Sequence, residues 1–347
     1  MSENLQNGGA GGLILGIESS CDDSSVAVMD ERSFELKFYE KISQEADHAK
    51  YGGVVPELAA RLHTEALPRI LQRVKPYFSE LSAVAATNTP GLSVSLIGGV
   101  NMAKALALAL NLPLIGVNHL IGHVYSLFLG GEARFPMGVL LVSGGHTMVL
   151  DIDAAGGIEI LATTGDDSFG ESFDKIAKML GLGYPGGALI EELAKGGEPR
   201  FELPVPLKGD RRLEYSFSGL KNAVRVQIEK LKEAGELDER AMRDLARCFE
   251  DAACAHILDK LQRIFELRRF TRFGVVGGAS ANLHLRGLLT DLCERAGCEI
   301  LFAPMKFCSD NAAMIARAAI EKLRKKEFVS PAELEIIPHL NLRSAFE

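Results

Sequence analysis

Two stretches of this chain share one strand–turn–strand pattern, and this repeat constrains the fold more than any other feature. Residues 13–30 hold two apolar runs separated by a small, polar segment. Residues 138–151 repeat the arrangement around the turn Ser143-Gly144-Gly145-His146. Short apolar runs bounded by turn residues indicate buried strands. Two such units predict a duplicated fold, with two unrelated hairpins as the alternative.

Helical patterns alternate with further short apolar runs in both halves of the chain, which predicts an α/β fold. Pro68 predicts a kink or break in the first helix. A length of 347 residues suits two lobes rather than one core. We expect a polar tail at 1–12, a first lobe from 13–135 plus 310–347, and a second lobe from 136–309. Helices are expected at 55–74, 92–110, 119–129, 173–180, 187–194, 218–234, 240–265, 281–296 and 310–325, and further strands at 83–87, 114–117, 273–276 and 300–303.

The charge balance excludes a uniformly basic surface for nucleic acid. The chain has 38 Lys and Arg against 46 Asp and Glu, a formal net charge of −8. Local basic groups remain, and each predicts either a solvated helix face or phosphate contacts. They comprise Lys208, Arg211, Arg212 and Lys221, and then Arg263, Arg268, Arg269 and Arg272.

The cysteines and the apolar segments indicate a cytoplasmic protein without a membrane span. The chain has 6 cysteines, no C-x-x-C pair and no secretion signal, which favours reduced thiols. Its longest apolar stretch, 95–117, contains Asn101, Lys104, Asn111 and Pro113. The first twelve residues are polar and Gly-rich, unlike a targeting peptide.

His119 and His123 form an H-x-x-x-H pair within an expected helix. Two histidines four residues apart face the same way and can bind one metal ion, whereas the alternative is two structural histidines. The pattern is not H-E-x-x-H, because Leu120 follows the first histidine, so the general base of zinc proteases is missing. Asp310 is a candidate third ligand, although the sequence alone favours Asp310 as the N-cap of the last helix.

Several small, Gly-rich segments could contact a nucleotide. Glycines in the 143–145 turn allow backbone N–H groups to approach an anion, and the 19–24 turn is its counterpart in the repeat. Segment 277–282 joins a strand to a helix, and Asn282 could bond a sugar or base. Loop 165–175 suits sugar hydroxyls, with Asp174 just inside the helix start, where the helix dipole also favours a carboxylate. Each segment could equally be an ordinary turn.

Taken together, these segments resemble the tRNA N6-adenosine threonylcarbamoyltransferases, the TsaD family, long misnamed O-sialoglycoprotein endopeptidases. The resemblance runs from about residue 13 to about residue 317. Nine motifs in this order carry it: IESSCD at 17–22, YGGVVPE at 51–57, HLIGH at 119–123, LVSGGHT at 141–147, FDK at 173–175, YPGG at 184–187, SFSGLK at 216–221, GGASAN at 277–282 and SDN at 309–311.

The resemblance implies an actin-like, sugar-kinase-like ATPase fold, with two duplicated lobes and a central nucleotide cleft. It implies one divalent metal ion per chain, iron(II) or zinc, on His119, His123 and Asp310. The family's substrate and nucleotide contacts fall on Leu141, Val142, Ser143, Gly144, Gly145, Asp174, Gly187 and Asn282, and on Glu191 at a position where relatives often have Asp.

The implied reaction moves the threonylcarbamoyl group of threonylcarbamoyl-AMP to the N6 amine of the adenosine 3′ of the anticodon. The tRNAs concerned read codons beginning with A. Asp22 is the candidate for handling the amine proton, with water as the alternative. The implied partners are a TsaB-like paralogue and a TsaE-like ATPase. Rival functions are a phosphotransferase or ATPase of the same fold, a non-catalytic nucleotide-sensing scaffold and, more remotely, a metalloprotease.

The sequence departs from the family pattern at several loop positions. Asn118 replaces the first His of a common His-His, and Ile121 stands where many relatives have Glu. Thr89 replaces the first Gly of Gly-Pro-Gly-Leu, and Ser168-Phe169 replaces Ala-Ala. These changes affect loop shape and weaken a protease function further, but they leave the implied ligand set intact.

Overall fold

The computed structural model describes residues 12–339, which divide into two compact units. Unit 1 comprises residues 12–44, 55–133 and 311–339 of the described chain. Unit 2 comprises residues 45–54 and 134–310. The expected tail at 1–12 lies almost entirely outside the described residues.

Unit 1 is built on a five-stranded mixed sheet. Its first strand, β1, is buried along its whole length and pairs antiparallel with β2, which pairs antiparallel with β3. On its other side β1 runs parallel to β4, which runs parallel to β5. The strand order is β3(Leu36–Ser43), β2(Asp23–Asp30), β1(Leu13–Glu18), β4(Leu81–Thr89) and β5(Leu114–Asn118).

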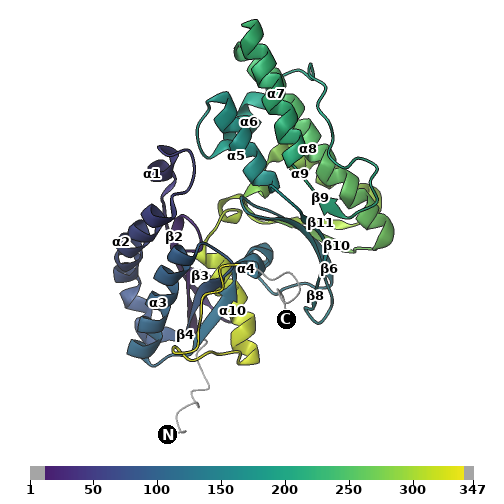
Figure 1. The fold of residues 1–347 in the computed structure, drawn as a ribbon. Helices are drawn as coiled ribbons and strands as arrows, with labels where there is room; N and C mark the ends of the chain where they lie inside the picture. Colours follow the sequence, from purple (N-terminus) through teal and green to yellow (C-terminus); the bar gives the residue numbers. More distant parts are fainter. Residues whose placement is uncertain (1–11, 340–347) are drawn as a thin grey trace. The chain divides into compact units, whose positions relative to one another are not determined.

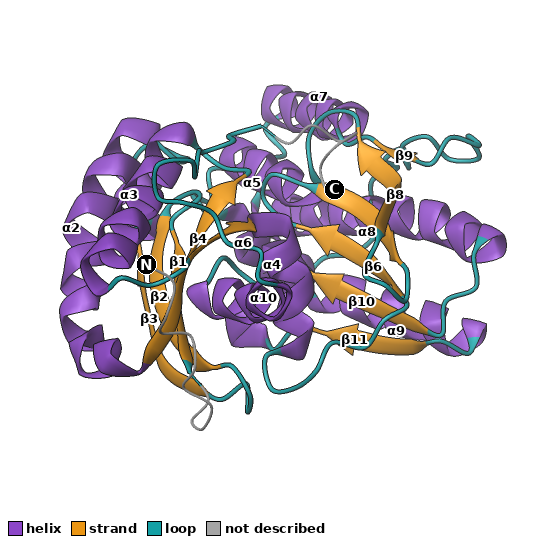
Figure 2. Ribbon diagram, turned by 90° about the horizontal axis from the view of Figure 1, so that it is seen from below, coloured by secondary structure: helices purple, strands orange, loops and turns teal. Residues whose placement is uncertain are grey.

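Helices cover both faces of this sheet (Figures 1 and 2). Helices α2 (Pro56–Val74) and α3 (Ser93–Leu110) pack on one face, and α4 (His119–Tyr125) and α10 (Ala312–Lys325) pack on the other. A Cβ added at Gly16 of β1 would lie 2.8 Å from the carbonyl oxygen of Ala312. Strand and helix backbones therefore touch, which only glycine permits.

Unit 2 repeats this topology in a six-stranded sheet. Strands β6, β7 and β8 pair antiparallel in sequence order, while β6 runs parallel to β10 and β10 to β11. Both sheets thus join a three-stranded antiparallel meander to two parallel strands. The strand order is β11(Glu299–Phe302), β10(Arg272–Val276), β6(Met137–Val142), β7(Thr147–Ile152), β8(Ile158–Thr164) and β9(Glu214–Tyr215).

The long helices of unit 2 form an apolar core against one face of its sheet (Figure 1). Phe173 packs against Phe169 and Phe249 in this core, with ring centroids 4.7 and 4.9 Å away. These helices are α5 (Phe169–Leu180), α6 (Gly186–Ala194), α7 (Ser218–Ala234), α8 (Glu239–Leu267) and α9 (Leu283–Ala296), while the short helix α1 (Glu45–Ala49) lies in the 45–54 segment outside this core. Short 3-10 helices span Lys75–Glu80 and Ser126–Phe128 in unit 1, and Gly278–Ala281 and Met305–Phe307 in unit 2.

Three local expectations are wrong. The break expected at Pro68 does not occur, because α2 continues through this residue, whose exposed position lets the ring face solvent. The helix expected at 119–129 ends at Tyr125 and continues as a 3-10 turn. The cap of α10 is Asn311 rather than Asp310, because the Asn311 side chain accepts the Met314 N–H at 2.9 Å.

Helix α3 combines a packed face with an exposed apolar face. Gly99 packs so closely on Ser19 that an added Cβ would collide with the serine side chain. On the opposite face of α3, Ile97 and Leu108 are exposed to solvent, with relative exposures of 45% and 69%. Within residues 12–339, α3 is also the one helix that is long and apolar enough to cross a membrane, judged by length and composition only.

Candidate metal centre and substrate site

The two histidines of the H-x-x-x-H pair lie on α4, directly after β5. Asn118 caps this helix, since its side-chain oxygen accepts the Leu120 N–H at 2.8 Å. His119 and His123 are both buried, with ring centroids 4.7 Å apart. The helix period therefore places both rings on one buried face, as the spacing predicts.

Asp310 joins this pair although it lies far away in sequence. Ligand atoms of His119, His123 and Asp310 all lie within 4.8 Å of one another. Two imidazole nitrogens and a carboxylate oxygen form a donor set that suits zinc or iron(II), and three protein ligands leave coordination positions for water or substrate. The residues therefore fit one divalent ion. Because Asn311 supplies the helix cap, Asp310 is not needed for that role.

A buried carboxylate, Glu18, lies against His119. Its Oε2 is 3.1 Å from His119 Nδ1, and the same ring nitrogen is 3.1 Å from Ser20 Oγ. In the sequence, Glu18 is part of the IESSCD motif, and no role was predicted for it. The sequence did contain a signal for such a role, because Glu18 is the one charged residue of an otherwise apolar strand. A carboxylate buried with such a strand usually has hydrogen-bonding or charged partners. Asp22, the proton-handling candidate, lies half-buried in the turn between β1 and β2.

The glycine turn of unit 2 sits at the carboxyl ends of two adjacent parallel strands, β6 and β10. In its Ser143-Gly144-Gly145 segment, a Cβ added at either glycine would meet no atom within 4 Å. Gly277 has a φ of +93°, and a Cβ there would collide with the carbonyl of Val142. Leu141 and Val142 are fully buried, so the exposed backbone belongs to the turn alone. Ligands of α/β sheets bind at such strand ends.

Two of the predicted nucleotide contacts meet at the start of α9. Asn282 caps α9 through the Leu285 N–H at 2.7 Å, and its amide donates to Glu250 at 2.7 Å. Glu191 Oε1 accepts the adjacent Leu283 N–H at 2.9 Å. Burial raises the pKa of Glu250, and the Asn282 hydrogen bond partly offsets that rise. The side chain of Asn282 is thus held in place by the protein.

Asp174 lies deeper in its helix than the sequence indicates. It is in the second turn of α5, which begins at Phe169 with Ser168 as its N-cap. Asp174 Oδ1 accepts the Gly186 N–H at 2.6 Å, so the carboxylate fixes the start of α6 beside Gly187. A Cβ added at Gly187 would meet nothing within 4 Å, so this position faces open space. The helix-dipole explanation of Asp174 is therefore wrong.

The acidic loop before α5 forms an ion pair with Lys221, a member of the first predicted basic group. Asp167 forms ion pairs with Lys175 and Lys221. Burial alone would raise the pKa of Asp167, but the two lysines outweigh it and lower that pKa. Asp166 accepts hydrogen bonds from Ser216 Oγ at 2.6 Å and from the backbone of Phe217 at 2.8 Å. This carboxylate therefore fixes the loop that leads into α7.

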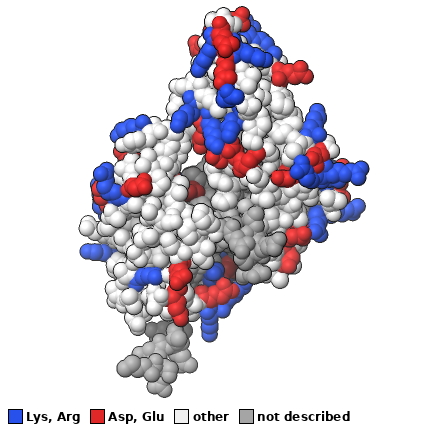
Figure 3. Space-filling model, viewed as in Figure 1, with Lys and Arg blue, Asp and Glu red and all other residues white. Residues whose placement is uncertain are grey.

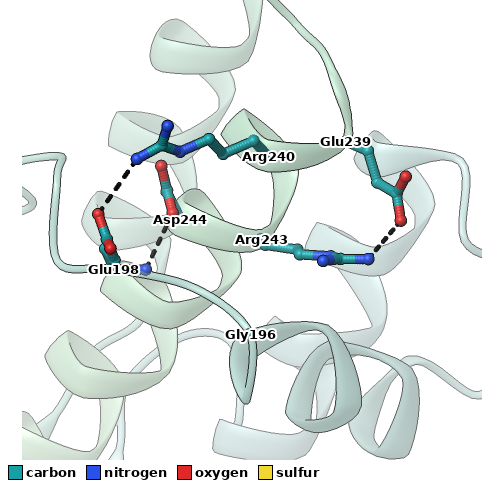
Figure 4. A pocket seen from close by; sticks show the side chains of 6 residues that line it. All are labelled: Gly196, Glu198, Glu239, Arg240, Arg243 and Asp244. Carbon is teal, nitrogen blue, oxygen red and sulfur yellow. Dashed lines mark hydrogen bonds and ion pairs between the residues drawn. The ribbon is translucent and has the colours of Figure 1, made fainter.

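Several other charged groups of unit 2 are paired within the protein. Arg212 pairs with Asp210 at 2.7 Å, and Arg268 with Glu159 at 2.9 Å. Figure 4 shows a pocket in which Arg240 pairs with Glu198 and Arg243 pairs with Glu239. These pairs reduce the positive charge that unit 2 can offer to a polyanion. The lining residues are Gly196, Glu198, Glu239, Arg240, Arg243 and Asp244.

Solved structures with the same fold share little sequence with this chain. Component A of the (R)-2-hydroxyglutaryl-CoA dehydratase of Acidaminococcus fermentans is 14% identical, with a TM-score of 0.55 over 91% of this chain and 99% of that one. Full-length HypF in its phosphate- and nucleotide-bound form is 14% identical, with a TM-score of 0.60 over 92% of this chain and 56% of that one. The fold is the actin-like, sugar-kinase-like ATPase class, as predicted.

Sequence comparison identifies the family. The profile of TsaD, tRNA N6-adenosine threonylcarbamoyltransferase, matches residues 38–317. Proteins of that name from Campylobacter hominis and Campylobacter curvus are each 63% identical, over 329 and 337 residues, which cover 95% and 94% of this chain and 98% and 99% of the relatives. The chain belongs to the tRNA N6-adenosine threonylcarbamoyltransferase family, so the predicted family and transferase class are confirmed.

Proposed function

We propose that this chain transfers the threonylcarbamoyl group of threonylcarbamoyl-AMP to the N6 amine of the adenosine 3′ of the anticodon. The main support for this proposal is the family match over residues 38–317, together with the close grouping of the His119, His123 and Asp310 side chains. The amine attacks the carbamoyl carbonyl, AMP leaves, and the amine loses one proton. The product is N6-threonylcarbamoyladenosine in tRNA, and no covalent enzyme intermediate is required.

The metal centre holds one divalent ion, with iron(II) as the first candidate and zinc as the second. His119 and His123 would bind it through ring nitrogens and Asp310 through a carboxylate oxygen. When bound, the ion supplies a Lewis acid that polarises the donor as AMP leaves. The burial of both histidines excludes competing water from their side of the site.

The adenylate binds in unit 2, at the carboxyl ends of β6 and β10. The Ser143–Gly145 turn offers backbone N–H groups to the phosphate, because its glycines leave open space around it. The 277–282 segment packs on that turn through Gly277. Asp174, Gly187, Glu191 and Asn282 contact the ribose and adenine. Their own hydrogen bonds to Gly186 and Leu283 pre-organise the carboxylates for this role.

Asp22 accepts the proton of the attacking amine, with water as the alternative. Its place in the turn between β1 and β2 leaves the carboxylate partly accessible to solvent. A carboxylate that is accessible to water can pass the proton on after the transfer.

The chain works with protein partners in the cytoplasm, a TsaB-like paralogue and a TsaE-like ATPase. A net charge of −8 is unfavourable for binding tRNA alone. The exposed face of α3 offers Val94, Ile97 and Leu108 to a partner helix, and Figure 3 shows few charged side chains over this helix. A partner that covers this face could also extend the positive surface.

One experiment tests the reaction. Purified chain, with and without the two partners, is incubated with threonylcarbamoyl-AMP and unmodified tRNA, and the nucleosides are analysed by mass spectrometry. We expect N6-threonylcarbamoyladenosine, with more product when the partners are present. Rapid ATP turnover without tRNA and no modified nucleoside would favour a phosphotransferase instead. Unchanged modification after replacement of both histidines would remove the proposed metal role.

A further inference from the structure

Glu18 is a fully buried carboxylate at the carboxyl end of β1. Its Oε1 accepts the backbone N–H of Ser20 at 2.6 Å. Its Oε2 accepts the hydroxyl of Thr87, which lies on the adjacent parallel strand β4. Burying a charged group is costly unless hydrogen bonds compensate it, so these donors hold the carboxylate in one place.

The fixed carboxylate faces one nitrogen of a metal-binding candidate. Glu18 Oε2 lies 3.1 Å from Nδ1 of His119, which follows the end of strand β5. The donors from Ser20 and Thr87 favour the ionised form of Glu18, and an ionised carboxylate only accepts hydrogen bonds, so it favours a proton on Nδ1 of His119. Nε2 then carries the lone pair that a metal ion needs. Strands β1, β4 and β5 are neighbours in one sheet, which makes the arrangement rigid.

We propose that Glu18 is a positioning residue that holds His119 in the Nδ1–H tautomer and presents Nε2 to the metal ion. The inference rests on the metal centre proposed above. Carboxylate partners of this kind orient metal-binding histidines and increase their basicity, and their removal weakens metal binding by about 10- to 100-fold. Ser20 Oγ, also 3.1 Å from Nδ1, secures the same ring orientation.

The first test needs no metal. Long-range ¹H–¹⁵N correlation spectra of the metal-free, full-length protein report which nitrogen of His119 is protonated, with His119→Gln providing the assignment. We expect the Nδ1–H tautomer in the wild type. The Nε2–H tautomer in the wild type overturns the proposal.

The second test compares metal affinities by competition with a chromophoric chelator, using zinc(II) as the probe. Glu18→Gln keeps the volume but loses the charge, and we expect about 10- to 100-fold weaker binding and a mixed His119 tautomer. Thr87→Val is the matched control, because it removes one donor to the carboxylate and keeps the carboxylate itself. We expect a smaller loss of affinity than in Glu18→Gln, because the Ser20 N–H still holds the carboxylate beside His119.

The outcomes separate the two proposals. A wild-type protein that binds no zinc removes the metal centre, whatever the tautomer. A wild type that binds zinc, with equal affinity and an unchanged tautomer in Glu18→Gln, overturns the role of Glu18 alone. Equal losses in Glu18→Gln and Thr87→Val would also overturn it, because they would reveal a general packing effect. The visible spectrum of the cobalt(II) form reports the coordination geometry independently and should change only in Glu18→Gln.

Discussion

A buried histidine in α8 makes the stability of unit 2 depend on pH in a direction that can be worked out. His256 is fully buried, and its Nε2 accepts the backbone N–H of Ser216 at 3.0 Å. Its ring lies edge-on to Phe217, with centroids 5.3 Å apart. Burial, reinforced by the charge of Lys260, lowers the pKa of His256 from 6.5 to about 4. The imidazole is therefore neutral at pH 7.

The sign of the effect follows from proton binding in the two states. The unfolded chain takes up a proton on His256 near pH 6.5, whereas the folded protein does so only near pH 4. Protons therefore favour the unfolded state between these values, and stability falls as the pH falls. The full loss is about 3 kcal/mol, of which about 2 kcal/mol is reached at pH 5. Above pH 6.5 the group adds no pH dependence.

The variant His256→Gln isolates this contribution. Glutamine keeps an acceptor for the Ser216 N–H but does not titrate, while all other ionisable groups are shared with the wild type. The free energy of unfolding is measured by urea denaturation from pH 7 to pH 4.5, with far-UV circular dichroism as the signal. The wild type should lose about 2 kcal/mol more than the variant by pH 5. Parallel pH dependences, or a folded-state ring titration near pH 6.5, would refute the reasoning.

Three further predictions concern the metal centre, α9 and α3. His119→Ala and His123→Ala should each remain folded but lose the metal, which reaches about one equivalent per chain in the wild type by elemental analysis; full occupancy in the double variant would contradict the assignment. Asn282→Ala should lower the free energy of unfolding by about 1 kcal/mol through loss of the α9 cap, and weaken adenylate binding by roughly 1–3 kcal/mol in calorimetric titration; equal affinity would limit Asn282 to capping. Leu108→Glu should weaken binding of the TsaB-like partner at least about tenfold in a pull-down titration, because it places a charge on an apolar interface; the exposed α7 variant Lys232→Glu is the control, and similar behaviour of the two would exclude the α3 face.

Elements with a strong apolar pattern were predictable from the sequence, whereas elements stabilised by neighbours were not. Strand β1 and helix α7 have the expected bounds because β1 is apolar up to its last residue, Glu18, and Gly235 ends α7 in the left-handed conformation. Strands β3 and β8 were missed, since their residues are mostly half-buried and mixed in polarity. Tertiary pairing with β2 and β7 decides their structure.

The candidate site likewise combines features that the local sequence determines with features that depend on tertiary structure. The spacing of His119 and His123 is a local signal, so the helix period alone places them together. The approach of Asp310 depends on the path of the whole chain. The sequence offered Asp310 as a candidate third ligand, but only the family resemblance favoured the ligand role over a helix cap. Local reasoning favoured Asp310 as a cap because Asp and Asn are nearly equivalent N-caps, and the structure selects Asn311.

The late position of α10 in the chain has a consequence for biosynthesis. Helix α10 covers β1 and β2, yet the ribosome completes residues 134–310 of unit 2 before α10 emerges. Unit 2 is almost continuous in sequence and can therefore fold first, while one apolar face of the nascent unit 1 sheet stays uncovered. Asp310 is the last residue of this part of unit 2, and Asn311 directly precedes α10. Closure of unit 1 and completion of the proposed metal ligand set therefore both wait for the last part of the chain, and a chain truncated before residue 310 would lack both.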